Sequence, residues 1–143
     1  MNPVTQTIIL SASTLRMLPH IAIYLLHRKD IDADLTQVQD RRAGVLNFIK
    51  ACTRERTFRN LFYYRIGEYL SAPIRWMLPG ERTLNIWCPS IGKGAHLEHA
   101  YATYLNAEGI GERFYCLQMV TLGNGKGGRP TLGDDVEIYT GAT

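Results

Sequence analysis

Hydrophobic residues follow two different patterns along the 143-residue chain, and the change falls near Gly80. Before it, apolar residues recur every three or four positions, which is the spacing of amphipathic helices. Ser11, Ser13 and Thr14 offer side-chain oxygens that predict a helix start ahead of the apolar run. The segments expected to be helical are 15–26, a new start within 30–34, 45–52, and 58–70 ending before Pro73.

After Gly80 the period of the apolar positions becomes six, which fits neither a helix nor a strand of simple alternation. The steps between successive members are 6, 6, 7, 6, 6, 10 and 6 residues. A six-residue period is typical of a parallel β-helix, in which each turn buries its core only against its neighbours. The members are Ile91, Leu97, Thr103, Ile110, Cys116, Leu122, Leu132 and Ile138.

Glycine follows four of these eight positions, at Gly92, Gly111, Gly123 and Gly133. Glycine populates backbone angles that other residues avoid. We therefore expect these four residues to form corners with unusual backbone angles. The hexapeptide pattern stops at Thr143, five residues after Ile138, so the sequence predicts a coil that is truncated at its carboxyl end.

Charge divides the chain at the same place. Residues 1–80 hold 11 Lys and Arg against 6 Asp and Glu, whereas residues 81–143 hold 5 against 7. We expect an α+β protein with two domains, a helical region over 1–80 and a β-helix over 81–143. The overall charge of +3 is too small to indicate nucleic-acid binding.

Cysteine spacing and the N-terminal sequence indicate in which cellular compartment the protein is expected. Three cysteines without a CxxC pair predict neither a disulfide framework nor a zinc site, and no other metal cluster is visible. The N-terminus lacks the features of a signal peptide, and its apolar stretch is shorter than the roughly 20 residues of a membrane span. These features favour a cytoplasmic protein.

Two interpretations of the helical half remain open. The simpler one is a small helical cap whose arginines Arg59, Arg65 and Arg75 are solvated. The other is a helix that contacts a membrane surface or a second subunit, because aromatic residues and arginine are favoured at both kinds of interface.

Residues 91–142 resemble the serine acetyltransferase group of hexapeptide-repeat acyltransferases, and also the related O-acetyltransferases of bacterial polysaccharide loci. Segment 58–67 is similar to the polysaccharide branch. Four motifs carry the resemblance. They are IGKG with Leu97-Glu98-His99, Leu117-Gln118 with Val120-Thr121-Leu122-Gly123, the glycine-rich segment Gly125-Lys126-Gly127-Gly128-Arg129-Pro130, and Leu132-Gly133-Asp134-Asp135-Val136.

The resemblance implies a left-handed β-helix that assembles as a homotrimer or a dimer of trimers. It implies acetyl-CoA as co-substrate, bound between subunits, and direct acetyl transfer to a hydroxyl without a covalent enzyme intermediate. The acceptor is L-serine or, as the alternative, a sugar hydroxyl. A non-catalytic scaffold that uses the helical half is a third hypothesis.

The resemblance places the general base at His99, because histidine titrates near neutral pH and a hydroxyl needs a base to become a nucleophile. Glu98, beside it, is a second catalytic candidate that would hold the acceptor, or else a solvated charge. We expect His96 to be an exposed residue, with a helper role at an interface as the alternative. Where the family has an aspartate that orients the histidine, this chain has Leu84 or Asn85, which carry no charge.

The long glycine-rich segment is the candidate cofactor site. The resemblance assigns cofactor binding to Thr121, Gly123, Gly125, Lys126 and Gly127, whose backbone N–H groups and positive charge suit phosphates. Arg129 is the candidate for an acceptor carboxylate. In serine acetyltransferases this segment contains Arg-His-Pro, whereas here it is Gly128-Arg129-Pro130 and the histidine is absent. A flexible surface excursion is the alternative.

Overall fold

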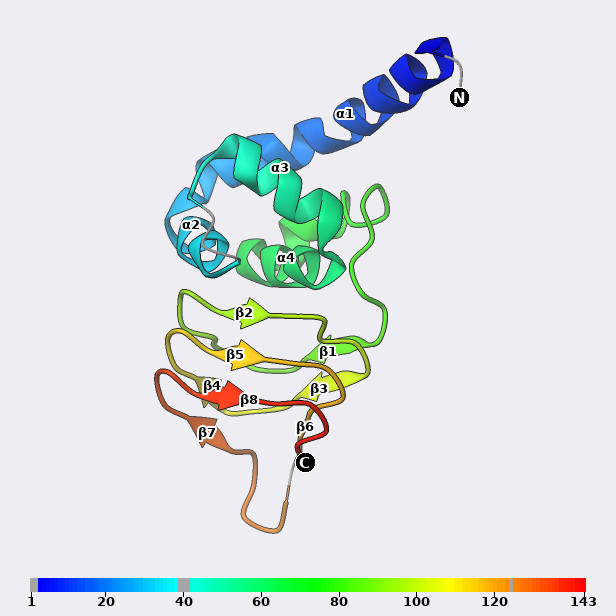
Figure 1. Ribbon diagram of the computed structural model, residues 1–143. Coiled ribbons are helices and arrows are strands. Elements are labelled where there is room, and N and C mark those ends of the chain that lie inside the picture. Colours follow the sequence, from blue (N-terminus) through cyan, green and yellow to red (C-terminus); the bar gives the residue numbers. More distant parts are fainter. Residues whose placement is uncertain (1–2, 39–41, 124) are drawn as a thin grey trace.

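The N-terminal half of the computed structural model is helical, and the C-terminal half consists of short strands (Figure 1). The structure describes residues 3–38, 42–123 and 125–143, with the backbone alone for residues 3–14. The helices are α1 (Pro3–Leu26), α2 (Arg28–Gln37), α3 (Val45–Arg54) and α4 (Arg56–Ser71). Among the described residues, no helix is long and apolar enough to cross a membrane.

The helices predicted over 45–52 and 58–70 lie within α3 and α4, but the starts expected for the first two helices are wrong. Helix α2 begins at Arg28, so the expected break at 30–34 lies inside it. Helix α1 begins at Pro3, so Ser11, Ser13 and Thr14 lie inside it and not at its start. Proline is well tolerated at a first helical position, and no further proline or glycine interrupts the chain before Pro19. Pro19 is therefore an interior residue of α1.

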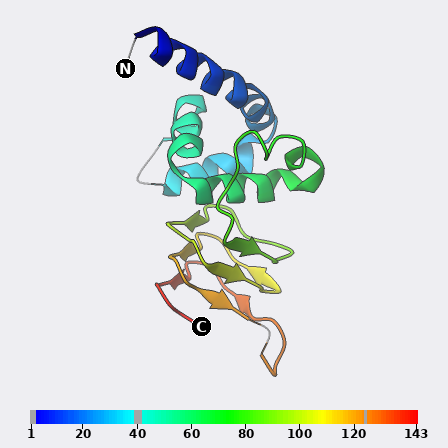
Figure 2. The ribbon, with the colours of Figure 1, turned by 90° about the vertical axis from the view of Figure 1, so that its right-hand side faces the viewer.

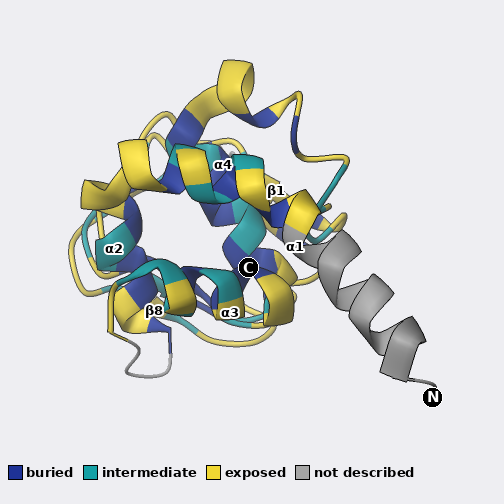
Figure 3. Cartoon of the chain, turned by 90° about the horizontal axis from the view of Figure 1, so that it is seen from above, coloured by how far each residue is buried: buried dark blue, intermediate teal, exposed yellow. Residues whose placement is uncertain are grey.

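Aromatic side chains form the core of the helical half. The rings of Tyr24 in α1 and Phe48 in α3 stack with centroids 4.3 Å apart. Phe62 of α4 meets Phe48 edge-on at 5.1 Å, and all three side chains are buried. Figure 3 shows the exposed residues of α2, α3 and α4 on the outer rim of this group. Stacked and edge-on pairs add to the stabilisation that burial provides.

The strands form three small parallel sheets, and the chain passes from one sheet to the next (Figure 2). The sheet orders are β1-β3-β6, β2-β5-β8 and β4-β7, and Ile91 pairs with Ile110 to extend the last. All eight residues of the six-residue period lie in a strand or in this bridge. The strands are β1 (Leu84–Ile86), β2 (His96–Leu97), β3 (Thr103–Leu105), β4 (Gly109–Ile110), β5 (Tyr115–Cys116), β6 (Thr121–Leu122), β7 (Thr131–Leu132) and β8 (Glu137–Ile138).

The register differs from the sequence interpretation at one strand. Leu105 of β3, and not Thr103, is the neighbour of Leu122 in β6. Thr103 is also buried, and its partner in β1 is Leu84. Strand β3 turns both of its end residues inward, so either one satisfies the hydrophobic pattern, and only backbone pairing selects between them.

Two of the four glycines of the repeat, Gly92 and Gly111, are required for close packing between coils, and the expectation of unusual backbone angles is wrong for all four. None of the four has a positive φ. A Cβ added to Gly92 would lie 2.5 Å from the Gly111 carbonyl carbon, and one added to Gly111 would lie 2.5 Å from the Gly133 carbonyl oxygen. The positive φ values occur two positions later instead, at Gly94, Arg113 and Asp135.

Substituting Gly111 by alanine is expected to destabilise the stacked strands by about 1–3 kcal/mol, because the added methyl group would meet backbone that cannot move aside. Gly133→Ala is the matched control, since an added Cβ there has nothing within 4 Å. Urea unfolding of both variants measures the difference. Equal stability of the two variants would contradict this account of the glycine positions.

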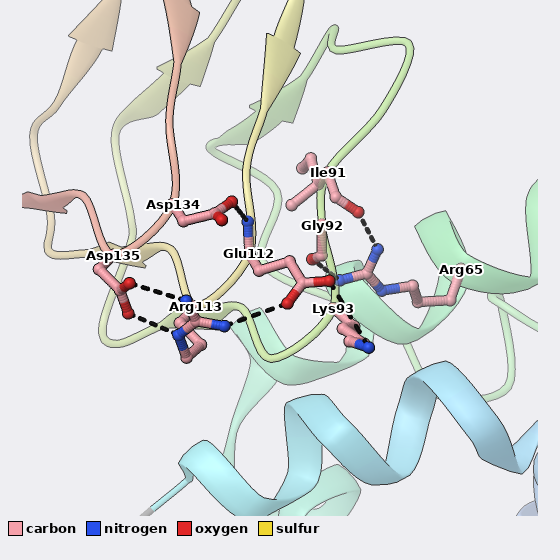
Figure 4. Close-up of polar contacts among 8 residues, drawn as sticks. All are labelled: Arg65, Ile91, Gly92, Lys93, Glu112, Arg113, Asp134 and Asp135. Carbon is pink, nitrogen blue, oxygen red and sulfur yellow. Dashed lines mark hydrogen bonds and ion pairs between the residues drawn. The ribbon is translucent and has the colours of Figure 1, made fainter.

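A buried ion pair joins the helices to the strands. Arg65 of α4 donates two hydrogen bonds to the Asp34 carboxylate of α2, at 2.7 and 2.9 Å. The same guanidinium donates to the backbone carbonyls of Ile91 and Gly92 (Figure 4), and Asp34 also accepts the Ala95 N–H at 2.9 Å. Arg65 is therefore not solvated, contrary to the simpler interpretation of the helical half.

The other two arginines of that interpretation differ from each other. Arg59 is half-buried and donates to the backbone carbonyls of Cys52, Thr53 and Pro79, so it is also a structural residue. Arg75 is the exposed one, as expected, and pairs with Glu68. Two of the three arginines, Arg59 and Arg65, thus hydrogen-bond α4 to neighbouring segments.

A second polar network lies along one corner of the strands, where residues of successive coils are stacked. Arg113 donates to both carboxylate oxygens of Asp135, at 2.5 and 2.7 Å, and also reaches Glu112. The Glu112 N–H donates to Asp134 at 2.8 Å (Figure 4). These side-chain contacts join the coil that contains Glu112 and Arg113 to the following coil, in addition to the strand pairing.

Candidate active site

His99 lies in the turn that follows β2. Leu97 points into the core and is buried, and the chain then turns outward through Glu98 and His99. His99 has a φ of 50°, an uncommon conformation for a residue with a side chain. Its imidazole is 76% exposed, so the turn presents it to solvent and to ligands.

Glu98 is half-buried and has a fixed partner, which a freely solvated charge would lack. The hydroxyl of Tyr115, in the neighbouring strand β5, donates to the Glu98 carboxylate at 2.5 Å. This hydrogen bond raises the pKa of Tyr115 to about 12, so the phenol stays protonated and keeps donating. The other Glu98 oxygen lies 4.0 Å from Nε2 of His99, at the limit of an ion pair.

His96 belongs to the same group, and the expectation that it is an exposed residue is wrong. Its side chain is half-buried, and its ring meets the Tyr115 ring edge-on, with centroids 5.5 Å apart. His96 and Tyr115 are paired residues of adjacent strands, and this register brings them together on the outer face of the sheet.

A cleft of about 450 Å³ between the strands and the helices is lined by His96, Glu98 and His99, but not by Tyr115. The cleft lies where the α3–α4 junction faces the turn after β2. A volume of this size is typical of sites that bind small molecules. Its charged or titratable lining residues are Arg54, Glu55, Arg56, Glu81, His96, Glu98, His99 and Tyr101.

Glu81 is a candidate that the sequence analysis missed. It lines the cleft together with His99, and its carboxylate accepts the N–H and the hydroxyl of Thr83, at 3.0 and 2.8 Å. These hydrogen bonds hold its pKa below the usual range, and Arg56 adds to the effect. Its sequence position, after Pro79-Gly80, indicates a turn and gives no sign that the carboxylate belongs near His99.

Leu84 and Asn85, the two positions considered for an orienting partner of His99, do not line this cleft. Leu84 is buried in the core of the strands, and Asn85 is exposed on the outer face of β1. Glu81 is accordingly the carboxylate of the cleft that lies nearest to these positions in the sequence.

The candidate cofactor segment lies apart from this cleft. It connects β6 to β7 at the end of the stacked strands away from the helices, whereas β2 lies next to them (Figure 1). Thr121, Gly123, Gly125, Lys126 and Gly127 are all exposed, and Asn124 lies outside the described residues. A single chain therefore does not bring the two groups of predicted site residues together.

Arg129 is held by the body of the strands. It donates to the Glu108 carboxylate at 2.8 Å and to the Trp87 carbonyl at 3.3 Å. The hydrogen bond to Glu108 raises the pKa of Arg129 further. The arginine at the end of the segment thus has partners, while Lys126, within the segment, is exposed.

The sequence predicted no disulfide framework and no metal site, and the cysteines concerned lie outside the His99 cleft. Cys52, Cys88 and Cys116 are buried free thiols, and burial raises the pKa of Cys116 to about 12. Within the described ranges, no group of three or more His, Cys, Asp or Glu side chains is arranged to hold a metal ion.

Comparison with known proteins gives one informative result. No family model matches the chain, and no curated protein is significantly similar to it in sequence. Among solved structures, the chain is similar to the serine acetyltransferase CysE of Neisseria gonorrhoeae, crystallised in complex with serine, with a TM-score of 0.58 and 21% identity. The match covers 85% of this chain.

The chain has a serine acetyltransferase-like fold. It spans about half of the gonococcal chain, 56% of its length. At 21% identity the similarity establishes the arrangement of four helices followed by short parallel strands, and the chemistry has to be argued from the residues of this chain.

Proposed function

We propose that this protein is an acetyl-CoA-dependent acyltransferase that transfers the acetyl group directly to a hydroxyl, with L-serine as the lead acceptor. The observation that carries the proposal is the position of His99. In a serine acetyltransferase-like fold, its exposed imidazole lies in a cleft of small-molecule size beside the carboxylate of Glu98.

His99 would remove the proton from the acceptor hydroxyl and later protonate the departing CoA thiolate. Glu98, fixed by Tyr115, would hold the ammonium group or the hydroxyl of the acceptor. Glu81 is our candidate for the negative charge that stabilises the imidazolium, in place of the neutral Leu84 and Asn85. An acetyl group passes from the thioester sulfur to the acceptor oxygen, and the acceptor proton ends on the thiol.

The finer points of the architecture belong to the same proposal. We infer that the strands of 81–143 form a left-handed β-helix, with residues 1–80 as a separate helical domain. Assembly into a homotrimer would bring the segment around Gly123–Gly127 of one subunit toward the His99 cleft of another. Within one chain the His99 cleft and the Gly123–Gly127 segment lie apart, so neither forms a complete acetyl-CoA site. The trimer would bring the two together and complete it.

A sugar hydroxyl is the alternative acceptor, in a polysaccharide-type pathway. The observation that favours it is the glycine-rich segment Gly128-Arg129-Pro130, which lacks the histidine of the serine acetyltransferase motif. Arg129, the candidate for an amino-acid carboxylate, is already paired with Glu108.

Thiol release from acetyl-CoA, followed with a chromogenic disulfide, tests the proposal. L-serine and UDP-N-acetylglucosamine are offered separately as acceptors. We expect release that depends on L-serine; release with the sugar nucleotide alone would reverse the order of the two acceptors. Absence of release with both, together with absence of CoA binding by calorimetry, would instead support the non-catalytic scaffold.

A further inference from the structure

The His99 cleft has a positively charged wall that the helical half provides. Arg54 is the last residue of α3, and Arg56 is the first residue of α4. Both line the cleft opposite the turn that carries Glu98 and His99. The two arginines are separated by Glu55 alone, whose extended backbone, with φ −119° and ψ 105°, makes the corner between the helices.

The side chains of both arginines are exposed along this wall. Across the described residues, neither side chain makes a hydrogen bond or an ion pair. Glu98 accepts a hydrogen bond from Tyr115. Glu81 accepts from Thr83, and the charge of Arg56 helps to hold its pKa low. Glu55, which has interactions of its own, is the third carboxylate of the lining.

The start of α4 adds to the positive potential. Thr57, in its first turn, also lines the cleft, and no side chain caps this end of the helix. Backbone N–H groups at a helix start favour a bound anion. Guanidinium groups complement carboxylate and phosphate oxygens through paired hydrogen bonds.

From this arrangement we propose that the cleft recognises an acceptor by an anionic group, a carboxylate or a phosphate, which Arg54 and Arg56 hold while the hydroxyl faces His99. The inference rests on the proposed acetyl transfer and specifies the class of acceptor. It assigns the charge recognition to the helical half, because Arg129 is paired with Glu108 and the cofactor segment lies at the other end of the strands.

Calorimetric titration of the full chain tests the inference with two pairs of probes. L-serine is compared with L-serinamide, which lacks the carboxylate, and UDP-N-acetylglucosamine with N-acetylglucosamine, which lacks the phosphates. For Arg54→Gln/Arg56→Gln we expect about a 10- to 100-fold loss of affinity for the anionic member of the pair that binds, because hydrogen bonds to charged groups are strong. Affinity for its counterpart and for acetyl-CoA is expected to stay unchanged. An effect on the serine pair identifies the carboxylate as the recognised group, and an effect on the sugar pair identifies the phosphate.

The control variant Lys50→Gln/Arg82→Gln removes the same charge from exposed residues outside this cleft and is expected to bind like the parent. Equal binding of the anionic probes by parent and Arg54→Gln/Arg56→Gln would overturn the inference. So would an equal loss for the uncharged counterpart, a loss confined to acetyl-CoA, or a parent protein that binds none of the four probes.

Failure of the proposed function is distinguishable from failure of this inference. Arginine-dependent binding of an anionic probe without any thiol release would contradict acetyl transfer and leave anion recognition standing. Suppose instead that Arg54→Gln/Arg56→Gln releases thiol with the same rate and the same KM for the acceptor as the parent. That result would contradict anion recognition by the arginines and leave acetyl transfer standing.

Discussion

Replacing His99 by alanine is expected to lower kcat for acetyl transfer by about 10²- to 10⁴-fold, which is what a positioned general base contributes. The imidazole is exposed and makes only a 4.0 Å contact with Glu98, so its loss removes the base without disturbing the core. Stability and acetyl-CoA affinity are expected to be unchanged. Steady-state kinetics of thiol release, with calorimetry for CoA, measure the three quantities.

Two further histidines make this prediction specific. His27→Ala changes an exposed histidine next to α2, away from the cleft, and is expected to behave like the parent. His96→Ala changes the histidine that packs against Tyr115 in the same cleft. If His96→Ala lost activity to the full extent while His99→Ala retained it, the base would have been assigned to the wrong histidine.

Replacing Asp34 by asparagine is expected to lower the free energy of unfolding by about 3–5 kcal/mol, because it leaves a buried guanidinium without a counter-charge. The side chains of Asp34 and Arg65 are only 2% and 9% exposed. Burial raises the pKa of Asp34, while the hydrogen bonds from Arg65 and Ala95 act in the opposite direction. Urea denaturation, monitored by tryptophan fluorescence, gives the difference.

An exposed ion pair between α4 and the turn that follows it provides the control. Glu68 pairs with Arg75 at 2.7 Å, with side chains that are 73% and 45% exposed. Glu68→Gln makes the same change from acid to amide and is expected to cost less than about 1 kcal/mol. Similar losses for Asp34→Asn and Glu68→Gln would show that the Asp34–Arg65 pair does not hold the helices to the strands.

Much of the fold follows from hydrophobic spacing, because burial requires a periodicity that matches each secondary structure. The stripe that ends before Pro73 predicted α4, and the six-residue period located the strands from Ile91 to Ile138. The prediction failed where more than one backbone arrangement is compatible with the same pattern of hydrophobic and polar residues. Side-chain oxygens at Ser11–Thr14 suit a helix start and also tolerate a helix interior, and Thr103 and Leu105 are equally acceptable inward residues.

The candidate site could be predicted only in part. His99 and Glu98 were identified from neighbouring residues, and their role as site residues stays a prediction. Arg54, Arg56 and Glu81 were missed because they enter the cleft from other elements, 45, 43 and 18 positions before His99. His96 was misjudged because its surroundings depend on Tyr115, which strand register places beside it.

The sequence by itself determined the division into a helical half and a half with a six-residue period, since local spacing records which side of each element is buried. It also determined that a histidine follows an inward leucine at Leu97. Only the tertiary structure decided which side chains share a cleft, that Arg65 is a buried link, and that Gly92 and Gly111 serve close packing. These properties depend on distances between segments far apart in the chain, which local periodicity does not specify.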